Sequence, residues 1–317
     1  MNILGIETSC DETAAAIVSD GVKVRSNVVI SSLKEHAAFG GIIPEIASRR
    51  QIESIYTIVS HALSQAKMSL KDIDAIAVTT KPGLIGSLLV GISFARGLAY
   101  AIGKPLIEVD HIQAHWYANF LRLKEDKNRL PSLPAVGLVV SGGHTSLFEI
   151  KDFNKVKLLG VTRDDAAGEA FDKVARLLDL GYPGGPVIDR LAKEGVNDKI
   201  RFPRARLESK YDFSFSGLKT AVLYYTRKHK DYNVKEIAYS FQESVVDVLT
   251  NQAIEACLAK KVKTLLIGGG VAANSALRDR LNDQGQSKGI KICFPPFAFC
   301  LDNAAMIAGL GFRMIEN

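Results

Sequence analysis

The chain has 317 residues, of which 47% are hydrophobic and 23% charged, so it has the composition of a folded globular protein and not of a disordered one. We expect neither a secretion signal nor an apolar run long enough to span a bilayer, and the length suits two domains with separate cores. A net charge of +6 permits a polyanionic partner without establishing one, and four cysteines without a CxxC pair indicate the reduced thiols of a cytoplasmic protein.

Three apolar strands are predicted at the start of the chain. They cover Ile3 to Ile6, Ala14 to Val18 and Val22 to Val29. Asp20 and Gly21 predict a hairpin turn between the second and third strands. The polar turn between the first two strands contains Asp11, and a carboxylate in such a turn suggests either a bound cation or an acid–base task.

A helix and a further strand are predicted next. The segment Phe39 to Gln51 predicts a glycine turn that enters a helix, whose surface would either dock a partner or cap the first domain. The apolar positions expected on one face of this helix are Ile52, Ile55, Val59, Ala62 and Leu63. An apolar strand over Asp74 to Thr80 follows the helix.

The residues HIQAH, His111 to His115, follow the apolar run Pro105 to Val109 and predict the start of a helix. Two histidines four apart share one helix face, so both imidazoles can bind one metal ion. In the first turn the helix dipole disfavours imidazolium, which favours the neutral form that binds metal. A metalloprotease of the HExxH type needs glutamate where this chain has Ile112, so the base for peptide hydrolysis is missing. The alternative to a metal site is two helix histidines at chance spacing.

The N-terminal pattern of strands and turns recurs in the second half. After the polar stretch Leu123 to Pro134 come an apolar strand, Ala135 to Val140, a turn, Ser141 to His144, and two more strands. The apolar face of the helix that follows contains Phe171, Val174, Ala175 and Leu178, and another strand covers Lys263 to Gly270. This repetition predicts an α/β protein of two duplicated domains with a cleft between them. A single sheet is the alternative, but it leaves the repetition unexplained.

Glycine-rich turns are candidate anion sites. Ser141 to His144 and Gly268 to Leu281, the latter with Asn274 near a helix start, expose backbone N–H groups that can bind phosphates or carboxylates. Neither segment matches GxGxxG or a P-loop, which argues against ordinary dinucleotide or P-loop binding. With the N-terminal turn, they favour a nucleotide or acyl-phosphate cleft.

Charged side chains provide further candidates. Asp164 and Asp165 are expected to cap the helix that follows them, whereas Asp302, at another expected helix start, would either cap that helix or bind metal. The segments Arg201 to Arg206 and Tyr224 to Lys230 mix basic and aromatic residues. Such a mixture suits either a solvated helix face or contact with a nucleic acid.

Nine ordered motifs together resemble one known family. They are GIETSCDETAAAIV, GGIIPEIASRR, HIQAH, VVSGGHTSL, DDAAGEAFDKVARLL, YPGGPVID, FSFSGLKTAV, GGGVAANSALR and FCLDNAAMIA. From Asn2 to the last helix, without a large gap, they closely resemble the bacterial TsaD family of tRNA N6-adenosine threonylcarbamoyltransferases, formerly labelled O-sialoglycoprotein endopeptidases. The resemblance implies the duplicated actin/Hsp70/sugar-kinase (ASKHA) fold. We expect an N-terminal subdomain over residues 1–128, completed by 302–317, and a C-terminal subdomain over 129–301.

The resemblance implies transfer of the L-threonylcarbamoyl group from threonylcarbamoyl-AMP to N6 of adenosine 37 in tRNAs that read codons beginning with A, with release of AMP. It implies one divalent metal ion, Fe²⁺ or Zn²⁺, on His111, His115 and Asp302. The implied substrate-binding residues are Val139, Val140, Ser141, Gly142, Gly143, Asp172, Gly185, Asp189 and Asn274. We add Asp11 as the candidate general base, from the position of its motif alone. An ASKHA-fold small-molecule kinase or ATPase and a catalytically silent nucleotide-binding scaffold are the alternatives.

The resemblance also implies partners. They are tRNA, a TsaB-like protein of related fold and a TsaE-like ATPase. A cytoplasmic enzyme without membrane contact is expected.

Overall fold

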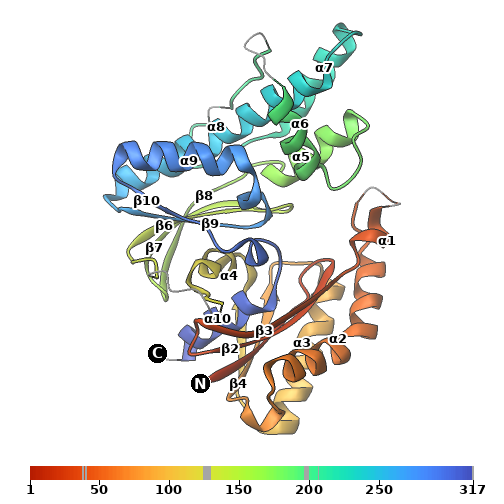
Figure 1. Ribbon diagram of the computed structural model, residues 1–317, viewed down its shortest axis with the longest axis vertical. Helices are drawn as coiled ribbons and strands as arrows, with labels where there is room; N and C mark the ends of the chain where they lie inside the picture. Colours follow the sequence, from red (N-terminus) through yellow and green to blue (C-terminus); the bar gives the residue numbers. More distant parts are fainter. Residues whose placement is uncertain (38, 40, 124–129, 196–199, 206, 316–317) are drawn as a thin grey trace. The chain divides into compact units, whose positions relative to one another are not determined.

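The computed structural model describes residues 1–37, 39, 41–123, 130–195, 200–205 and 207–315 (Figure 1). The chain divides into two compact units. Unit 1 joins Met1–Pro131 to Pro295–Asn317, and unit 2 is Ser132–Phe294. The C-terminal helix therefore belongs to the unit that contains the N-terminus.

Unit 1 is built on a five-stranded sheet with the order β3-β2-β1-β4-β5. Strands β1, β2 and β3 form an antiparallel meander, whereas β4 and β5 run parallel to β1. The strands are β1 (Asn2–Glu7), β2 (Glu12–Ser19), β3 (Lys23–Ser31), β4 (Ala75–Lys81) and β5 (Leu106–Asp110). The α-helices are α1 (Leu33–Ala37), α2 (Pro44–Ala66), α3 (Ile85–Ile102), α4 (His111–Tyr117) and α10 (Ala304–Ile315), and the 3₁₀ turns are η1 (Leu70–Asp72), η2 (Ala118–Phe120) and η4 (Phe297–Phe299).

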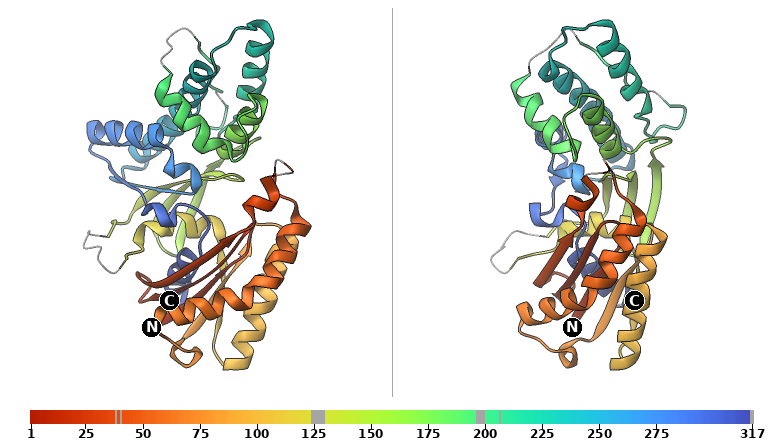
Figure 2. Two further views of the ribbon diagram at one scale, coloured as in Figure 1. Left: turned by 45° about the vertical axis from the view of Figure 1, so that its right-hand side comes forward. Right: turned by 90° about the vertical axis from the view of Figure 1, so that its right-hand side faces the viewer.

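Alternate side chains of β1 pack against different helices. Leu4 and Ile6 lie in a buried cluster with Ile58 of α2, because successive side chains of a strand point to opposite faces. Gly5 faces α10, where an added Cβ atom would come within 2.3 Å of the Ala304 carbonyl oxygen. Figure 2 shows α2 and α3 along one face of this sheet. The close approach at Gly5 seats the C-terminal helix on the strand whose end carries the candidate site.

Helix α2 differs in part from the sequence-based expectation. Ile55 and Val59 are buried as predicted, but Ile52 is 65% exposed. Gln51 occupies the buried position instead, and its Nε2 donates to the carbonyl oxygens of Cys10 and Glu12 at 2.9 and 3.1 Å. The buried face of α2 thus includes Gln51 in place of Ile52, which apolar periodicity does not predict.

Helix α3 contradicts the expectation that no apolar run is long enough to span a bilayer. Ile85–Ile102 passes that test by length and composition, with a mean hydropathy of 1.6. Only 28% of this segment is buried. Its exposed apolar side chains are therefore not explained by the core of unit 1.

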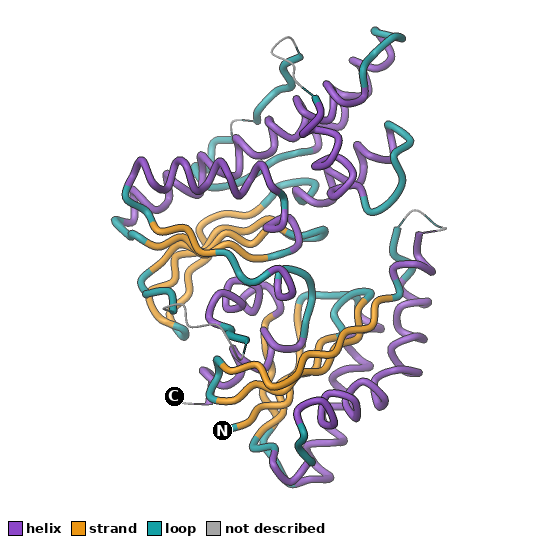
Figure 3. The backbone as a smooth tube through the Cα atoms, viewed as in Figure 1, coloured by secondary structure: helices purple, strands orange, loops and turns teal. Residues whose placement is uncertain are grey.

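Unit 2 repeats the topology of unit 1. Its sheet order β10-β9-β6-β7-β8 is the order of the first sheet read from the other edge, with the same antiparallel meander and the same two parallel strands. Figure 3 shows the two groups of strands in orange. The strands are β6 (Ala135–Val140), β7 (Thr145–Asp152), β8 (Lys155–Val161), β9 (Thr264–Gly268) and β10 (Lys291–Cys293). The helices are α5 (Ala167–Leu177), α6 (Gly184–Glu194), α7 (Ser216–Lys228), α8 (Val234–Lys260) and α9 (Ser275–Lys288), with the 3₁₀ turn η3 (Gly270–Ala273). The duplicated α/β fold is confirmed, and the single-sheet alternative is wrong.

The predicted capping role of Asp164 and Asp165 is wrong. The N-cap of α5 is Ala166. Asp164 instead accepts a hydrogen bond from the backbone N–H of Phe215 at 2.8 Å, at the start of α7. Asp165 pairs with the Nζ atom of Lys173 at 2.5 Å. Asp164 therefore stabilises the start of a helix about fifty residues later in the chain, and Asp165 forms an ion pair.

Candidate metal centre and substrate loops

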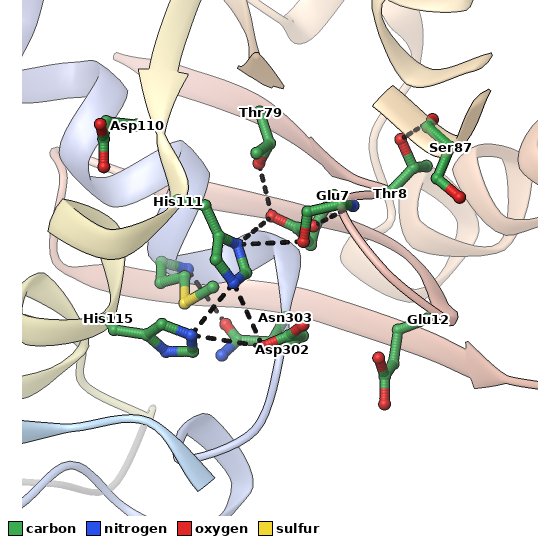
Figure 4. A network of polar contacts seen from close by, with 12 residues as sticks. Glu7, Thr8, Glu12, Thr79, Ser87, Asp110, His111, His115, Asp302 and Asn303 are labelled. Carbon is green, nitrogen blue, oxygen red and sulfur yellow. Dashed lines mark hydrogen bonds and ion pairs between the residues drawn. The ribbon is translucent and has the colours of Figure 1, made fainter. Parts of the chain in front are cut away.

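Three potential metal ligands meet in unit 1 (Figure 4). Strand β5 ends at Asp110, whose Oδ1 accepts a hydrogen bond from Gln113 N at 3.0 Å and caps α4. The helix therefore begins at His111, and both His111 and His115 are buried on its inner face. Asp302 comes from the segment that leads into α10. The fold thus joins residues almost two hundred positions apart in the sequence.

The three donor atoms are spaced as ligands of one ion. The Nε2 atoms of His111 and His115 are 3.2 Å apart, and Asp302 Oδ1 lies 3.5 and 3.3 Å from them. Ligands about 2.0–2.1 Å from one tetrahedral ion lie about 3.3–3.4 Å from each other. Two imidazoles and a carboxylate suit iron and zinc alike, and three protein ligands leave a position for substrate. This donor set fits a divalent metal ion.

Glu7, at the end of β1, orients His111. Its Oε2 lies 3.0 Å from His111 Nδ1, while Ser9 N and Thr79 Oγ1 both donate hydrogen bonds to the same carboxylate. A proton held on Nδ1 by this carboxylate leaves Nε2 free to bind metal. Glu7 is not among the residues predicted from the sequence, although a charged residue at the end of an apolar strand is a visible signal.

The electrostatics at His111 differ from the expectation based on the helix dipole. Burial alone would lower the pKa of His111, but the carboxylates of Glu7 and Asp302 raise it well above its usual value. Burial lowers the pKa of His115. Burial would raise the pKa of Asp302, but the two histidines hold it below its usual value. Two carboxylates therefore outweigh the helix dipole and give the cluster a negative charge that attracts a cation.

The cap of α10 and the predicted metal ligand are different residues. Asn303 Oδ1 accepts a hydrogen bond from Met306 N at 3.0 Å and so caps the first turn. Asp302 directs its carboxylate to the two histidines instead. The geometry therefore argues against the capping alternative for Asp302.

Replacing Glu7 by glutamine should weaken metal binding by about 10- to 100-fold, the usual effect of losing a partner of a ligating histidine. The amide keeps the side-chain volume but removes the charge and one of the oxygens that accept hydrogen bonds. Chelator competition on the purified protein measures the affinity. Glu108→Gln, an exposed carboxylate on β5, is the matched control. Equal metal affinity in the two variants would contradict an orienting role for Glu7.

Asp11 lies in the turn between β1 and β2 and is 7% exposed. Ser31 Oγ donates to Asp11 Oδ2 at 3.4 Å, and Ser32 Oγ donates to the Asp11 carbonyl oxygen at 2.8 Å. Burial raises the pKa of the adjacent Glu12 well above its usual value, and the charges of Asp302 and Asp11 add to the effect. Glu12 is not among the site residues predicted from the sequence. Glu12, the first residue of β2, thus places beside this turn a carboxyl group that holds its proton strongly.

Five predicted substrate-binding residues lie at the C-terminal end of β6. They are Val139, Val140, Ser141, Gly142 and Gly143. The side chains of both valines are fully buried, so only their backbone atoms can reach a substrate. An added Cβ atom at either glycine would meet no atom within 4 Å, and no described residue accepts a hydrogen bond from their N–H groups. Two bare amides at a strand end suit an anion such as a phosphate.

The other four predicted residues lie on α5, on α6 and at the N-cap of α9 in unit 2. They are Asp172, Gly185, Asp189 and Asn274. Asp172 of α5 accepts from Gly184 N at 2.7 Å at the start of α6, and burial raises its pKa. Asp189 of α6 accepts from Ser275 Oγ at 2.8 Å, and Asn274 caps α9 through Leu277 N at 2.9 Å. These contacts link α5, α6 and α9 within unit 2.

Comparison with known proteins gives one consistent family. The TsaD model, described as tRNA N6-adenosine threonylcarbamoyltransferase, matches residues 23–309. The chain is 52% identical over 317 residues to the tRNA N6-adenosine threonylcarbamoyltransferase of Clostridium botulinum (strain 657 / Type Ba4), covering 98% of this chain and 92% of that protein. The protein of that name from Clostridium perfringens (strain SM101 / Type A) is 52% identical over 315 residues, with 98% and 91% covered. Full-length HypF in its phosphate- and nucleotide-bound form shares the fold, with a TM-score of 0.68 at 13% identity over 100% of this chain and 47% of HypF.

Proposed function

This chain belongs to the TsaD family of tRNA N6-adenosine threonylcarbamoyltransferases, and we propose that a divalent metal ion on His111, His115 and Asp302 serves its transfer reaction. The enzyme forms threonylcarbamoyladenosine in tRNA. The observation that supports the metal is the separation of 3.2–3.5 Å among three donor atoms from two segments of unit 1.

The L-threonylcarbamoyl group passes from threonylcarbamoyl-AMP to N6 of adenosine 37 in the tRNA. A bond forms between N6 and the carbamoyl carbon, the bond from that carbon to the phosphate oxygen breaks, and AMP leaves. Asp11 accepts the proton that N6 loses, and the amides of Gly142 and Gly143 bind the phosphate as its charge grows. His111, His115 and Asp302 would hold a divalent ion, which would supply Lewis-acid polarisation of the carbonyl group.

A kinase or ATPase of the same fold is not favoured. Relatives that are 52% identical carry the transferase name. The pair His111 and His115 also has no task in phosphoryl transfer to a small molecule.

The test is nucleoside analysis of modified tRNA. The full chain is incubated with tRNA, ATP, threonine, bicarbonate and partner proteins. The tRNA is then digested, and its nucleosides are identified by mass spectrometry. Threonylcarbamoyladenosine should appear only when the chain is present. Its absence under every combination of partners would refute the function, and phosphorylation of a metabolite instead would favour the kinase.

Exposed apolar side chains on α2 and α3 support a protein partner at this surface, and we propose that the partner is the TsaB-like protein. Ile52 and Tyr56 are 65% and 74% exposed, four residues apart on α2, and Ile85 and Leu89 are 80% and 58% exposed at the same spacing on α3. Residues four apart lie on one side of a helix, so each helix presents an apolar strip. Such strips mark protein interfaces. A TsaE-like ATPase is proposed as a further component, and we propose that the assembly acts in the cytoplasm.

Leu89→Glu should weaken association with the TsaB-like partner by more than about tenfold, because the interface would bury an unpaired charge. Sedimentation of the mixed proteins measures the complex. Leu258→Glu is the matched control, since Leu258 is also an exposed leucine (51%) but lies on α8 of unit 2. Equal affinity in both variants would place the partner elsewhere.

A further inference from the structure

Two basic and aromatic segments of unit 2 line one cavity. The segment around Arg201 and the C-terminal end of α7 are separated by more than twenty residues in the sequence, yet both contribute to a cavity of about 370 Å³. This volume lies near the lower end of the range for ligand-binding pockets. Its basic and aromatic lining residues, here called the basic–aromatic pocket, are Arg201, Phe202, Tyr224, Tyr225, Lys228 and His229.

The cations of the pocket are not neutralised by the protein. Arg201 and Lys228 are exposed and form no ion pair with any residue that the structure describes. Helix α7, SGLKTAVLYYTRK, contains no acidic residue. The nearby Arg204 differs, because it is paired with Asp247. The pocket therefore presents positive charge to solvent, which suits a polyanion.

The aromatic residues have two roles. Tyr225 makes an edge contact with Phe202, at 6.0 Å between ring centroids, which joins the two segments, and a tilted contact with His229 at 4.5 Å within the end of α7. Tyr224 makes no ring contact with a described residue and is 65% exposed. A free aromatic ring beside unpaired cations is the arrangement that stacks on an unpaired nucleobase.

We propose that the basic–aromatic pocket binds a single-stranded segment of tRNA, with Tyr224 stacked on an unpaired base and Arg201 and Lys228 on the flanking phosphates. The identity of the RNA rests on the proposed function. An acidic peptide would satisfy the cations but not the ring, because the face of an aromatic ring is negative and does not attract carboxylates. The structure thus favours RNA over a protein partner at this surface.

Binding of a fluorescent stem-loop RNA to the full chain tests the proposal, with a blunt RNA duplex of equal charge as the comparison. Tyr224→Ala should weaken stem-loop binding by about 5- to 100-fold and leave duplex binding unchanged, whereas Tyr224→Phe should retain the stacking and the affinity. Arg201→Gln and Lys228→Gln should each reduce the slope of log affinity against log salt by about 0.7. Lys288→Gln should leave the slope unchanged, because Lys288 is an exposed cation on α9 with no ion-pair partner in the described part of the chain.

Three results would contradict the proposal that the basic–aromatic pocket binds single-stranded RNA. They are wild-type stem-loop affinity in Tyr224→Ala, an equal loss of stem-loop and duplex binding, and displacement of the RNA by polyglutamate at equal charge. The outcome is separable from that of the proposed function. In the tRNA modification assay Tyr224→Ala should raise the KM for tRNA without changing kcat. If the chain forms no threonylcarbamoyladenosine but binds the stem-loop through Tyr224, the proposed RNA site stands and the proposed transfer activity is refuted.

Discussion

Replacing His115 by alanine should remove the bound metal and slow threonylcarbamoyl transfer by about 10³-fold or more. A Lewis acid contributes several kcal/mol to such a reaction, and each 1.4 kcal/mol is about tenfold in rate. His115 is fully buried and supplies one of only three donor atoms in the described cluster, so two ligands would remain. Metal content of the purified protein and the rate of tRNA modification are the two measurements.

His61→Ala is the matched control, because His61 is an exposed histidine on α2 outside the cluster. Since loss of a buried imidazole also leaves a cavity, Asp302→Asn provides a second variant that keeps the side-chain volume. Added metal should raise the Tm of the wild-type protein and not that of either variant, because binding to the native state alone stabilises it. A fully active His115→Ala protein without metal would disprove the metal proposal.

Much of the fold follows from local patterns. Asp20 and Gly21 both adopt positive φ, as the predicted hairpin requires, and the apolar runs Ile3 to Ile6 and Ala14 to Val18 lie within β1 and β2 as expected. The face of α2 was harder to predict. Ile52 fits the apolar period but is exposed, because the buried position belongs to Gln51, which bonds to backbone carbonyls forty residues earlier. Apolar periodicity cannot show a polar side chain whose partner is that distant.

The candidate site shows the same limit. The spacing of His111 and His115 is local and visible, but Glu7 becomes a partner of His111 only because β4 pairs in parallel with both β1 and β5, which end at Glu7 and just before His111. Likewise Asp302 can be separated from a capping role only when Asn303 is seen to cap α10. Residue types and short spacings predict ligands, whereas the side chains that orient and charge them depend on long-range packing.

Asp11→Asn should lower the single-turnover rate of transfer from preformed threonylcarbamoyl-AMP by about 10²- to 10⁴-fold, the usual contribution of a general base. Asparagine has almost the same shape and can still accept the hydrogen bond from Ser31 Oγ, so the turn should keep its structure. Only the capacity to take the proton from N6 is lost. Adenylate binding, measured by calorimetry, should be unchanged.

Asp283→Asn, an exposed aspartate on α9, is the control for the loss of one negative charge. The two measurements on Asp11→Asn separate the possible roles of this carboxylate. A wild-type rate with intact binding would exclude Asp11 as the base. A loss of adenylate binding with a wild-type rate at saturating substrate would assign it a binding role instead. Only a slow chemical step with intact binding supports proton transfer to Asp11, since the substrate then binds normally and what fails is the reaction itself.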